Sequence, residues 1–311
     1  MSEISIKKLN DKISKNPMET ISESEERYKT VIDDLAKRVA ADDDIRVVLL
    51  AGPSGSGKTT SANLLSDDVN ALGKRCFVVS LDDFYRDAGD PLYPKQESGE
   101  RDYESPYALD IPCLVKTLKD IAECRDFTVP KYDFKVGRRV SVSNFSKMTH
   151  GCVVIEGLHA LNPIVYNELP KETVYKIFIS VSTNITSGEK RLISGRKMRF
   201  IRRMVRDNLY RNATAERTLS MWENVLDGEN KYLYPFRDNA DVAFDTFHQF
   251  ELAVMRDLAL NLISDDLAEK NQYAKAVKRA LLASVSISES LIPDDSLIRE
   301  FIPGGIYESL Y

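Results

Sequence analysis

The sequence of 311 residues contains only four cysteines, and their spacing is typical neither of a disulfide framework nor of a metal site. Cys76, Cys113, Cys124 and Cys152 include no C-x-x-C pair. Cys76 and Cys152 adjoin apolar runs, so we expect both to be buried free thiols. This use of cysteine favours a reducing, cytoplasmic location.

Long apolar runs and an excess of basic residues are also absent. No run approaches the length of a membrane span, and residues 1–20 have no apolar stretch behind Lys7 and Lys8. We therefore expect no secretory signal and no membrane partner. The 43 Lys and Arg residues face 48 Asp and Glu residues, for a formal net charge of −5. That balance argues against nucleic acid as a general partner.

What the sequence does contain is a phosphate-binding pattern. Residues 52–59 read GPSGSGKT and match G-x-x-x-x-G-K-[ST] at every fixed position. The apolar run 47–51 before them predicts a buried strand, and residues 60–65 predict a helix start. In this context, a simple Gly/Ser-rich turn is the weaker interpretation. We expect nucleotide contacts from Gly52, Ser54, Gly55, Ser56, Gly57, Lys58, Thr59 and Thr60.

The bound nucleotide is more consistent with ATP than with a dinucleotide or GTP. Thr60 stands where the dinucleotide fingerprint G-x-G-x-x-G requires its third glycine. The chain also has no N-K-x-D or T-K-x-D string of the kind that reads guanine. In the phosphate-binding pattern, Lys58 reaches the β- and γ-phosphates and the Thr59 hydroxyl ligates Mg²⁺.

Carboxylates follow two of the predicted strands. Asp82 and Asp83 end the strand 76–81, and Glu156 follows the apolar run 152–155. Ligands of an open α/β sheet bind at the carboxyl ends of its strands. Mg²⁺ and a positioned acceptor hydroxyl are what phosphoryl transfer requires. The alternatives are a helix cap or turn for the aspartates and a solvated strand end for Glu156.

An arginine-rich segment comes later in the chain. Nine basic residues lie between Lys190 and Arg211, and only Asp207 opposes them. Helical spacing places four of them on one face, namely Arg199, Arg202, Arg203 and Arg206. A solvated amphipathic helix is the usual explanation of such a run. The unbalanced sign favours a phosphate-facing lid, since arginine binds phosphate oxygens bidentately. An RNA-binding helix fits the acidic net charge poorly.

Alternating strand-like and helix-like segments predict an α/β fold with a parallel sheet covered by helices on both faces. Predicted strands are 47–51, 76–81, 152–155, 174–181 and 242–244, and predicted helices are 109–124, 189–211, 214–227 and 249–263. Residues 1–44 form an N-terminal helical extension with a capping box at Ser22 and Glu25. Residues 45–265 form the central domain. We expect residues 266–311 to form a C-terminal helical extension, with a helix entry at residues 293–296, that serves packing or a homo-oligomer contact.

Together these motifs resemble the phosphoribulokinase/uridine kinase family, closest to its bacterial uridine kinase-like branch. The resemblance spans most of residues 45–263. It rests on GPSGSGKTT (52–60), SLDDFY (80–85), DYESPYALD (102–110), VPKYDFKVGRR (129–139), VIEGLHALN (154–162), RFIRRMVRD (199–207) and YPFRDNADV (234–242). The tail, residues 292–305, is similar to the end of that branch. The resemblance implies a P-loop kinase domain that uses ATP and Mg²⁺.

The resemblance also implies roles for individual residues. Asp82 orients the acceptor hydroxyl, accepts its proton and lies near Mg²⁺, which Thr59 and Glu156 hold. The residues implied in catalysis are Asp82, Lys58, Arg203 and Arg206, and Arg211 joins the nucleotide contacts. The residues implied in acceptor binding are Asp83, Tyr85, Glu104, Tyr132 and Arg138. Gly137 departs from the family, because uridine kinases carry a base-reading histidine at this place.

The leading hypothesis is phosphoryl transfer from MgATP to a primary hydroxyl of a small molecule, with a nucleoside such as uridine as the first candidate. A second hypothesis keeps the reaction and replaces the acceptor by another sugar, a polyol or a pantothenate-like alcohol. It rests on Gly137 and on the basic residues Lys135, Arg138 and Arg139. A third hypothesis is a nucleotide-binding regulatory protein with little turnover, which Asp82 disfavours.

Overall fold

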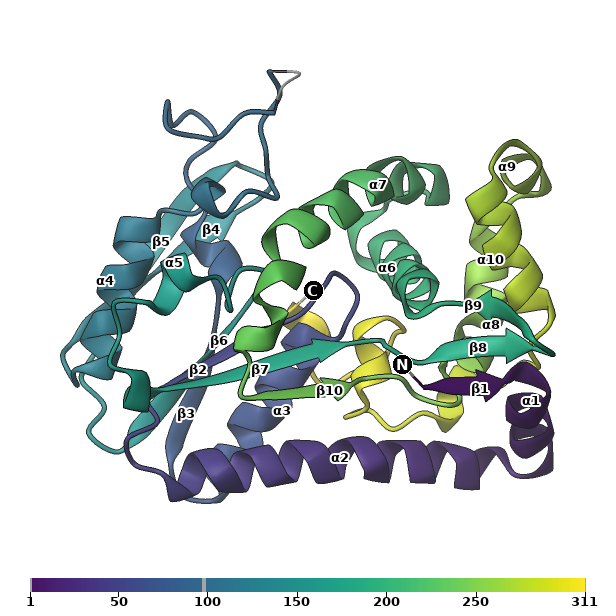
Figure 1. The fold of residues 1–311 in the computed structure, drawn as a ribbon, viewed down its shortest axis with the longest axis horizontal. Helices are drawn as coiled ribbons and strands as arrows, with labels where there is room; N and C mark the ends of the chain where they lie inside the picture. The colour runs from purple at the N-terminus through teal and green to yellow at the C-terminus, as the bar shows by residue number, and fades with distance from the viewer. Residues whose placement is uncertain (1, 97–98, 311) are drawn as a thin grey trace.

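The centre of the molecule is a five-stranded parallel sheet in the order β10-β7-β2-β6-β3 (Figure 1). The computed structural model describes residues 2–96 and 99–310. The sheet strands are β2 (Val47–Ala51), β3 (Arg75–Ser80), β6 (Gly151–Glu156), β7 (Val174–Ser180) and β10 (Val242–Asp245). β2 and β6 are buried along their whole length, as expected for parallel strands with helices on both faces. The α/β fold predicted from the sequence is confirmed.

Alternate residues of β2 serve two separate cores, one on each face of the sheet. Val48 and Leu50 join the larger core with the helices of one face, whereas Val47 and Leu49 face the other. The larger core is built with α2 (Pro17–Ala41), α3 (Lys58–Ala71), α6 (Gly195–Arg211), α7 (Ala215–Tyr232), α8 (Glu251–Leu262) and α10 (Gln272–Leu282). The smaller core is built with α4 (Ile111–Ala122) and α5 (Pro163–Tyr166).

Two small sheets accompany the central one and were not predicted. β4 (Phe127–Asp133) and β5 (Arg138–Phe145) form an antiparallel hairpin. β8 (Asn184–Ser187) pairs with β1 (Glu3–Ser5) and with β9 (Lys190–Ile193). Most of β5 is exposed, so it lacks the apolar alternation by which a half-buried strand is recognised.

The helix predicted over 189–211 is wrong at its start. Residues 190–193 are strand β9, and α6 begins at Gly195. The Ser194 side chain accepts a hydrogen bond from the Lys197 backbone N–H and so caps the new helix. The charge run therefore belongs to two elements, although the arginines of interest all lie on α6.

The helix start predicted for the N-terminal extension is also wrong. α2 begins at Pro17 behind the cap Asn16, which leaves Ser22 inside the helix. In the C-terminal extension, the helix entry predicted at residues 293–296 leads into a short 3₁₀ turn, η6 (Leu297–Glu300), whose first residues are capped by the Ser296 side chain. The remaining helices of the extensions are α1 (Ile6–Lys15) and α9 (Asp265–Lys270).

Both extensions contribute side chains to the larger core. Tyr28 of α2, Val277 of α10 and Phe301 after η6 are almost completely buried there. Figure 1 shows α2 along one side of the molecule and the yellow C-terminal segment beside α3. The boundaries 44/45 and 265/266 stay a prediction. Across residues 2–96 and 99–310, no helix is both long enough and apolar enough to cross a membrane.

Candidate active site

Strand register brings the predicted site residues to one edge of the sheet. Glu156, the last residue of β6, is paired with Leu50 of β2 on one side and with Ser80 of β3 on the other. The phosphate-binding loop starts just after β2, and Asp82 follows β3 in the turn η1 (Leu81–Phe84). Because neighbouring strands lie about 4.8 Å apart, these groups meet at the carboxyl edge.

The backbone of the loop 52–59 has a conformation that requires glycine. Gly55 has φ of 73° and Gly57 has φ of 90°, immediately before α3. A Cβ atom on Gly52 would lie 2.5 Å from the Ile179 carbonyl oxygen, and one on Gly55 would lie 2.7 Å from the Arg199 carbonyl oxygen. This loop therefore leads tightly into the N-terminus of α3, where backbone N–H groups favour an anion.

Two side chains beside the loop can donate to an incoming phosphate. Lys58 is the first residue of α3, and its Nζ donates only a 3.3 Å hydrogen bond to the Pro53 carbonyl. Arg206 Nε is buried and has no hydrogen-bond partner among the described residues. The loop, the helix N-terminus and these cations therefore fit a nucleotide polyphosphate.

The backbone N–H groups of Ser54 and Ser56 are engaged by the protein itself, whereas the buried Ser56 hydroxyl has no hydrogen-bond partner among the described residues. The Ser54 backbone N–H donates to Glu229 Oε1 at 2.9 Å, and its hydroxyl lies 2.9 Å from Arg203 Nη1. The Ser56 backbone N–H donates to the Pro53 carbonyl at 3.2 Å. These contacts fasten the loop to α6 and α7, and direct phosphate binding by either serine stays a prediction.

Two arginines of α6 brace the loop rather than facing solvent. Arg199 pairs with Glu229 at 2.7 Å, and its side chain is 1% exposed. Arg202 pairs with Glu251 at 2.6 Å, and its side chain is 0% exposed. Their guanidinium groups also donate to the carbonyls of Ser54 and Gly55. The prediction that the whole arginine face meets phosphate is therefore wrong for Arg199 and Arg202, because buried charges require close partners.

The remaining arginines gather around one aspartate. Asp207 accepts from Arg203 Nε at 3.2 Å and from Arg211 Nη1 at 3.0 Å, and it lies 4.0 Å from Arg206 Nε. Desolvation raises the pKa of Asp82, and the positive charges of Lys58, Arg211 and Arg206 oppose this rise. Asp207 thus holds three cations beside the candidate transfer centre.

The two acidic groups of the centre favour a cation between them. The pKa of Glu156 is raised to about 7, mainly by burial; the charge of Lys58 opposes this rise and that of Asp82 contributes to it. The pKa of Asp82 is likewise raised by desolvation, with Lys58 opposing the rise. No cluster of three or more potential protein ligands exists among the described residues. Thr59 and Glu156 fit Mg²⁺, which takes one or two carboxylates and completes its shell with phosphates and water.

An aromatic group lies on the acceptor side. The rings of Tyr85, Tyr132 and Phe134 are 5.0 to 5.8 Å apart. The Tyr85 hydroxyl donates to the Tyr103 carbonyl at 2.9 Å. Phe134 was not among the predicted site residues. It is 60% exposed and lies beside Tyr85 and Tyr132, which were predicted. Phe134 could have been predicted from the sequence, because it belongs to the segment 129–139 that resembles the family.

Glu104 lies in the loop before α4, packed against α7. Burial raises the pKa of Glu104 to about 7, and the charge of Arg203 opposes this shift. Gly228 of α7 packs against it so closely that a Cβ there would lie 2.6 Å from Glu104 Cβ.

His159 was missed by the sequence analysis. Its side chain is buried, burial lowers its pKa to about 4, and its Nδ1 has no partner within the described residues.

Asp83 supports the hairpin instead of facing a ligand. Its carboxylate lies 3.1 Å from Lys131 Nζ and accepts from the Tyr132 backbone N–H at 3.4 Å. These contacts connect η1 to β4. A direct role of Asp83 in acceptor binding therefore stays a prediction without support from its present partners.

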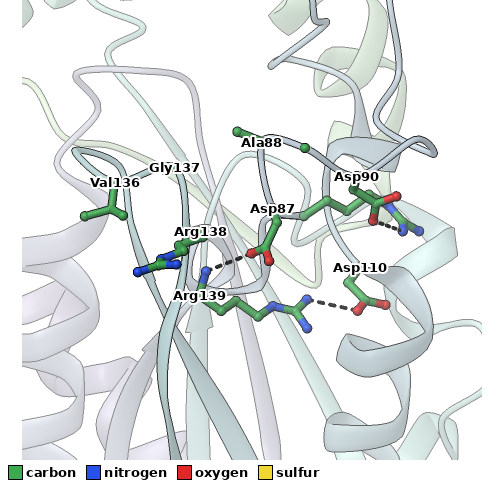
Figure 2. A pocket seen from close by; sticks show the side chains of 10 residues that line it. Asp87, Ala88, Asp90, Asp110, Val136, Gly137, Arg138 and Arg139 are labelled. Atoms are coloured by element: carbon green, nitrogen blue, oxygen red, sulfur yellow. Dashed lines mark hydrogen bonds and ion pairs between the residues drawn. The ribbon is translucent and has the colours of Figure 1, made fainter.

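Arg138 lines a cavity of about 640 Å³ that Figure 2 shows from close by. Its neighbour Arg139 is turned toward α4 and bonds Asp110 at 3.0 Å, while the Arg139 backbone N–H donates to Asp87 (Figure 2). Gly137 closes the hairpin turn with φ of 73°, and a Cβ there would lie 3.2 Å from Ala88 Cβ. The turn therefore disfavours any side chain at this place.

Comparisons with known proteins show which family the chain is similar to. A sequence model of the Phosphoribulokinase / Uridine kinase family matches residues 47–253. A uridine kinase of Deinococcus deserti is 30% identical over 198 residues, which are 63% of this chain and 85% of that protein. A uridine kinase of Staphylococcus epidermidis is 26% identical over 197 residues, with the same coverage of 63% and 85%. Among solved structures, a D-glycerate 3-kinase of Cryptococcus neoformans aligns over 72% of this chain and 91% of its own, with 16% identity and a TM-score of 0.45.

Proposed function

Since the chain belongs to the phosphoribulokinase/uridine kinase family, we propose that it transfers a phosphoryl group from MgATP to a primary hydroxyl of a small molecule. The observation that carries the proposal is the meeting of the loop 52–59, Glu156 and Asp82 at one sheet edge. A nucleoside is the first acceptor to test, because the relatives that match include proteins named uridine kinase.

In the proposed reaction, ATP supplies the phosphoryl group and Mg²⁺ neutralises charge on its phosphates. Asp82 accepts the proton of the acceptor hydroxyl, since its carboxylate follows β3 at the edge of the sheet where the loop 52–59 and Glu156 also lie. Lys58 binds phosphate oxygens from the start of α3. Arg203, Arg206 and Arg211 stabilise the charge that develops during transfer.

The acceptor is proposed to lie against Tyr85, Tyr132 and Phe134. Aromatic rings of this kind cover a base or a sugar face. The Glu104 carboxylate accepts hydrogen bonds from sugar hydroxyls, for which a diol offers two donors. Arg138 adds a positive charge at the rim, where a polar acceptor group can pair with it.

One observation favours a second class of acceptor. Gly137 replaces the histidine that reads the pyrimidine in uridine kinases, and Ala88 occupies the space beside it. A sugar, polyol or pantothenate-like alcohol would not need that histidine. The reaction and the roles of Asp82 and Glu104 are the same for both classes.

The experiment is an acceptor panel with purified protein. Nucleosides, sugars, polyols and pantothenate are offered with MgATP or MgGTP, and acceptor-dependent release of the nucleoside diphosphate is measured. We expect at least one hydroxyl acceptor to stimulate release with MgATP. If the protein binds MgATP but phosphorylates none of the acceptors in the panel, the result would instead support the regulatory, nucleotide-binding alternative.

A further inference from the structure

The C-terminal segment reaches the phosphate-binding loop. Leu297 of η6 is 0% exposed, and a Cβ on Gly57 would lie 2.6 Å from its Cδ1. In Figure 1 this yellow segment lies beside α3, far in sequence from the loop that it contacts. The predicted nucleotide site therefore includes residues from the end of the chain.

Glu300 carries a negative charge into this contact. Its Oε2 accepts a 3.3 Å hydrogen bond from the Thr60 backbone N–H in the first turn of α3. Its Oε1 accepts a 2.8 Å hydrogen bond from Arg206 Nη1. The Glu300 side chain is 2% exposed, so the carboxylate is enclosed by these donors.

These two donors are of the kind that would bind a nucleotide. The first-turn amides of a helix after a phosphate-binding loop favour an anion, and arginine pairs with phosphate oxygens. Glu300 also acts electrostatically on the candidate metal ligand, because its charge contributes to raising the pKa of Glu156. A carboxylate of the protein thus accepts hydrogen bonds from two donors beside the phosphate-binding loop that are suited to an anion.

The rest of the segment is anchored independently of Glu300. Arg299 donates to the carbonyls of Pro293, Ile292 and Glu289. The backbone of the segment is therefore held by contacts that do not involve the Glu300 carboxylate.

We propose that Glu300 is an internal competitor of the nucleotide, which holds the Thr60 amide and Arg206 until a phosphate displaces its carboxylate. The inference rests on the proposed nucleotide site and adds a regulatory contact to it. Displacement would release Arg206 toward the phosphates, so that nucleotide binding itself completes the set of catalytic cations. The contact lowers nucleotide affinity, because the phosphate has to displace the Glu300 carboxylate from both donors.

The test compares wild type with Glu300→Gln, Glu300→Asp and the control Glu289→Gln. Glu289 lies in the same segment, and among the described residues no ion pair joins its carboxylate to Arg206. Calorimetry measures the Kd of a non-hydrolysable MgATP analogue. We expect Glu300→Gln to bind about tenfold more tightly, because the phosphate no longer displaces a charged hydrogen-bond acceptor. Glu300→Asp, whose shorter side chain reaches both donors less well, should also bind more tightly, and Glu289→Gln should match wild type.

Thermal unfolding with and without the analogue shows whether Glu300 competes with the nucleotide or only stabilises the site. Glu300→Gln should unfold at a lower temperature without nucleotide and show a larger stabilisation by the analogue than wild type. Unchanged or weaker binding by the folded Gln and Asp variants would overturn the proposal, since Glu300 would then only support the site. If Glu300→Gln does not fold, the Asp variant decides. No nucleotide binding by any variant would also overturn it.

This readout is separate from the proposed reaction. If wild type binds the analogue but phosphorylates no acceptor, the proposed function fails. The ratio of the Kd values for wild type and Glu300→Gln still decides the role of Glu300.

Discussion

Asp82 is the residue on which the proposed chemistry depends most. We expect Asp82→Asn to lower kcat by roughly 100-fold or more, because an amide cannot accept the hydroxyl proton. The Kd of MgATP should change much less, since the loop and Lys58 are untouched. Stopped assays of transfer and calorimetry of nucleotide binding measure the two quantities. Retention of full turnover would remove Asp82 from the role of base.

Glu104 should make acceptor binding depend on pH. Its pKa is raised to about 7, so the carboxylate gains a proton as the pH falls through that value. The protonated group is a weaker hydrogen-bond acceptor, and the acceptor KM should rise roughly tenfold from about pH 8 to about pH 6. Initial rates at saturating MgATP give KM and kcat separately.

The matched variant for this prediction is Glu104→Gln. Its acceptor KM should be high at every pH and should lose the dependence near neutrality, because glutamine does not titrate. A wild-type KM that stays constant over this range would contradict the role of Glu104. So would a variant whose only defect is in ATP affinity.

Sequence reasoning predicted residues with a motif better than residues without one. The loop 52–59 and Glu156 could be found because strand, loop and helix patterns surround them. His159 and Glu300 could not, because their neighbours come from α7 and from the start of α3, far away in sequence. The partners of Asp83 likewise depend on how the hairpin docks on η1.

At the scale of elements, α6 combines a buried brace with a candidate lid. Arg199 and Arg202 pair inward with Glu229 and Glu251, whereas Asp207 organises the arginines nearer to the site. The sequence predicts a helix rich in arginine, but not this division. Exposure of an arginine is decided by α7 and α8 packing against α6, which periodicity does not encode.

Asp207 can be tested as a positioning residue. We expect Asp207→Asn to lower kcat roughly tenfold and to leave the acceptor KM nearly unchanged, because Arg203 and Arg211 lose their shared partner. The exposed Asp227 of α7 provides the control Asp227→Asn, which should match wild type. A loss of stability without a change in kcat would assign Asp207 a purely structural role.

At the scale of the whole molecule, both extensions meet the central domain at a buried carboxyl group. Glu25 of α2 accepts from the Ser296 hydroxyl, and its Oε2 lies 3.8 Å from His248 Nε2. Burial raises the pKa of Glu25 to about 7. The sequence predicted helical extensions, but not their joint burial, since burial here requires three distant segments to assemble.

This carboxyl should make stability fall with rising pH. The folded protein binds the Glu25 proton more tightly than the unfolded chain, so the stabilisation is present below the unfolded pKa near 4.5 and is lost as the pH rises through about 7. The loss is at most about 3 kcal/mol. Glu25→Gln should lack this component and be more stable than wild type near pH 8.

Urea unfolding at several pH values measures the effect, and the difference between wild type and variant isolates Glu25 from other buried carboxyl groups. Glu26→Gln on the exposed side of α2 is the control and should follow wild type. A constant difference between wild type and Glu25→Gln at every pH would show that the shift in pKa is absent.

The most direct test of the central claim is transfer of the γ-phosphoryl group of labelled ATP to an added acceptor in the presence of Mg²⁺. The account predicts label on the hydroxyl of a nucleoside or another small alcohol. It also predicts that Lys58→Ala and Asp82→Asn each nearly abolish this transfer. Label found only in inorganic phosphate, with no acceptor modified across the panel, would contradict the claim.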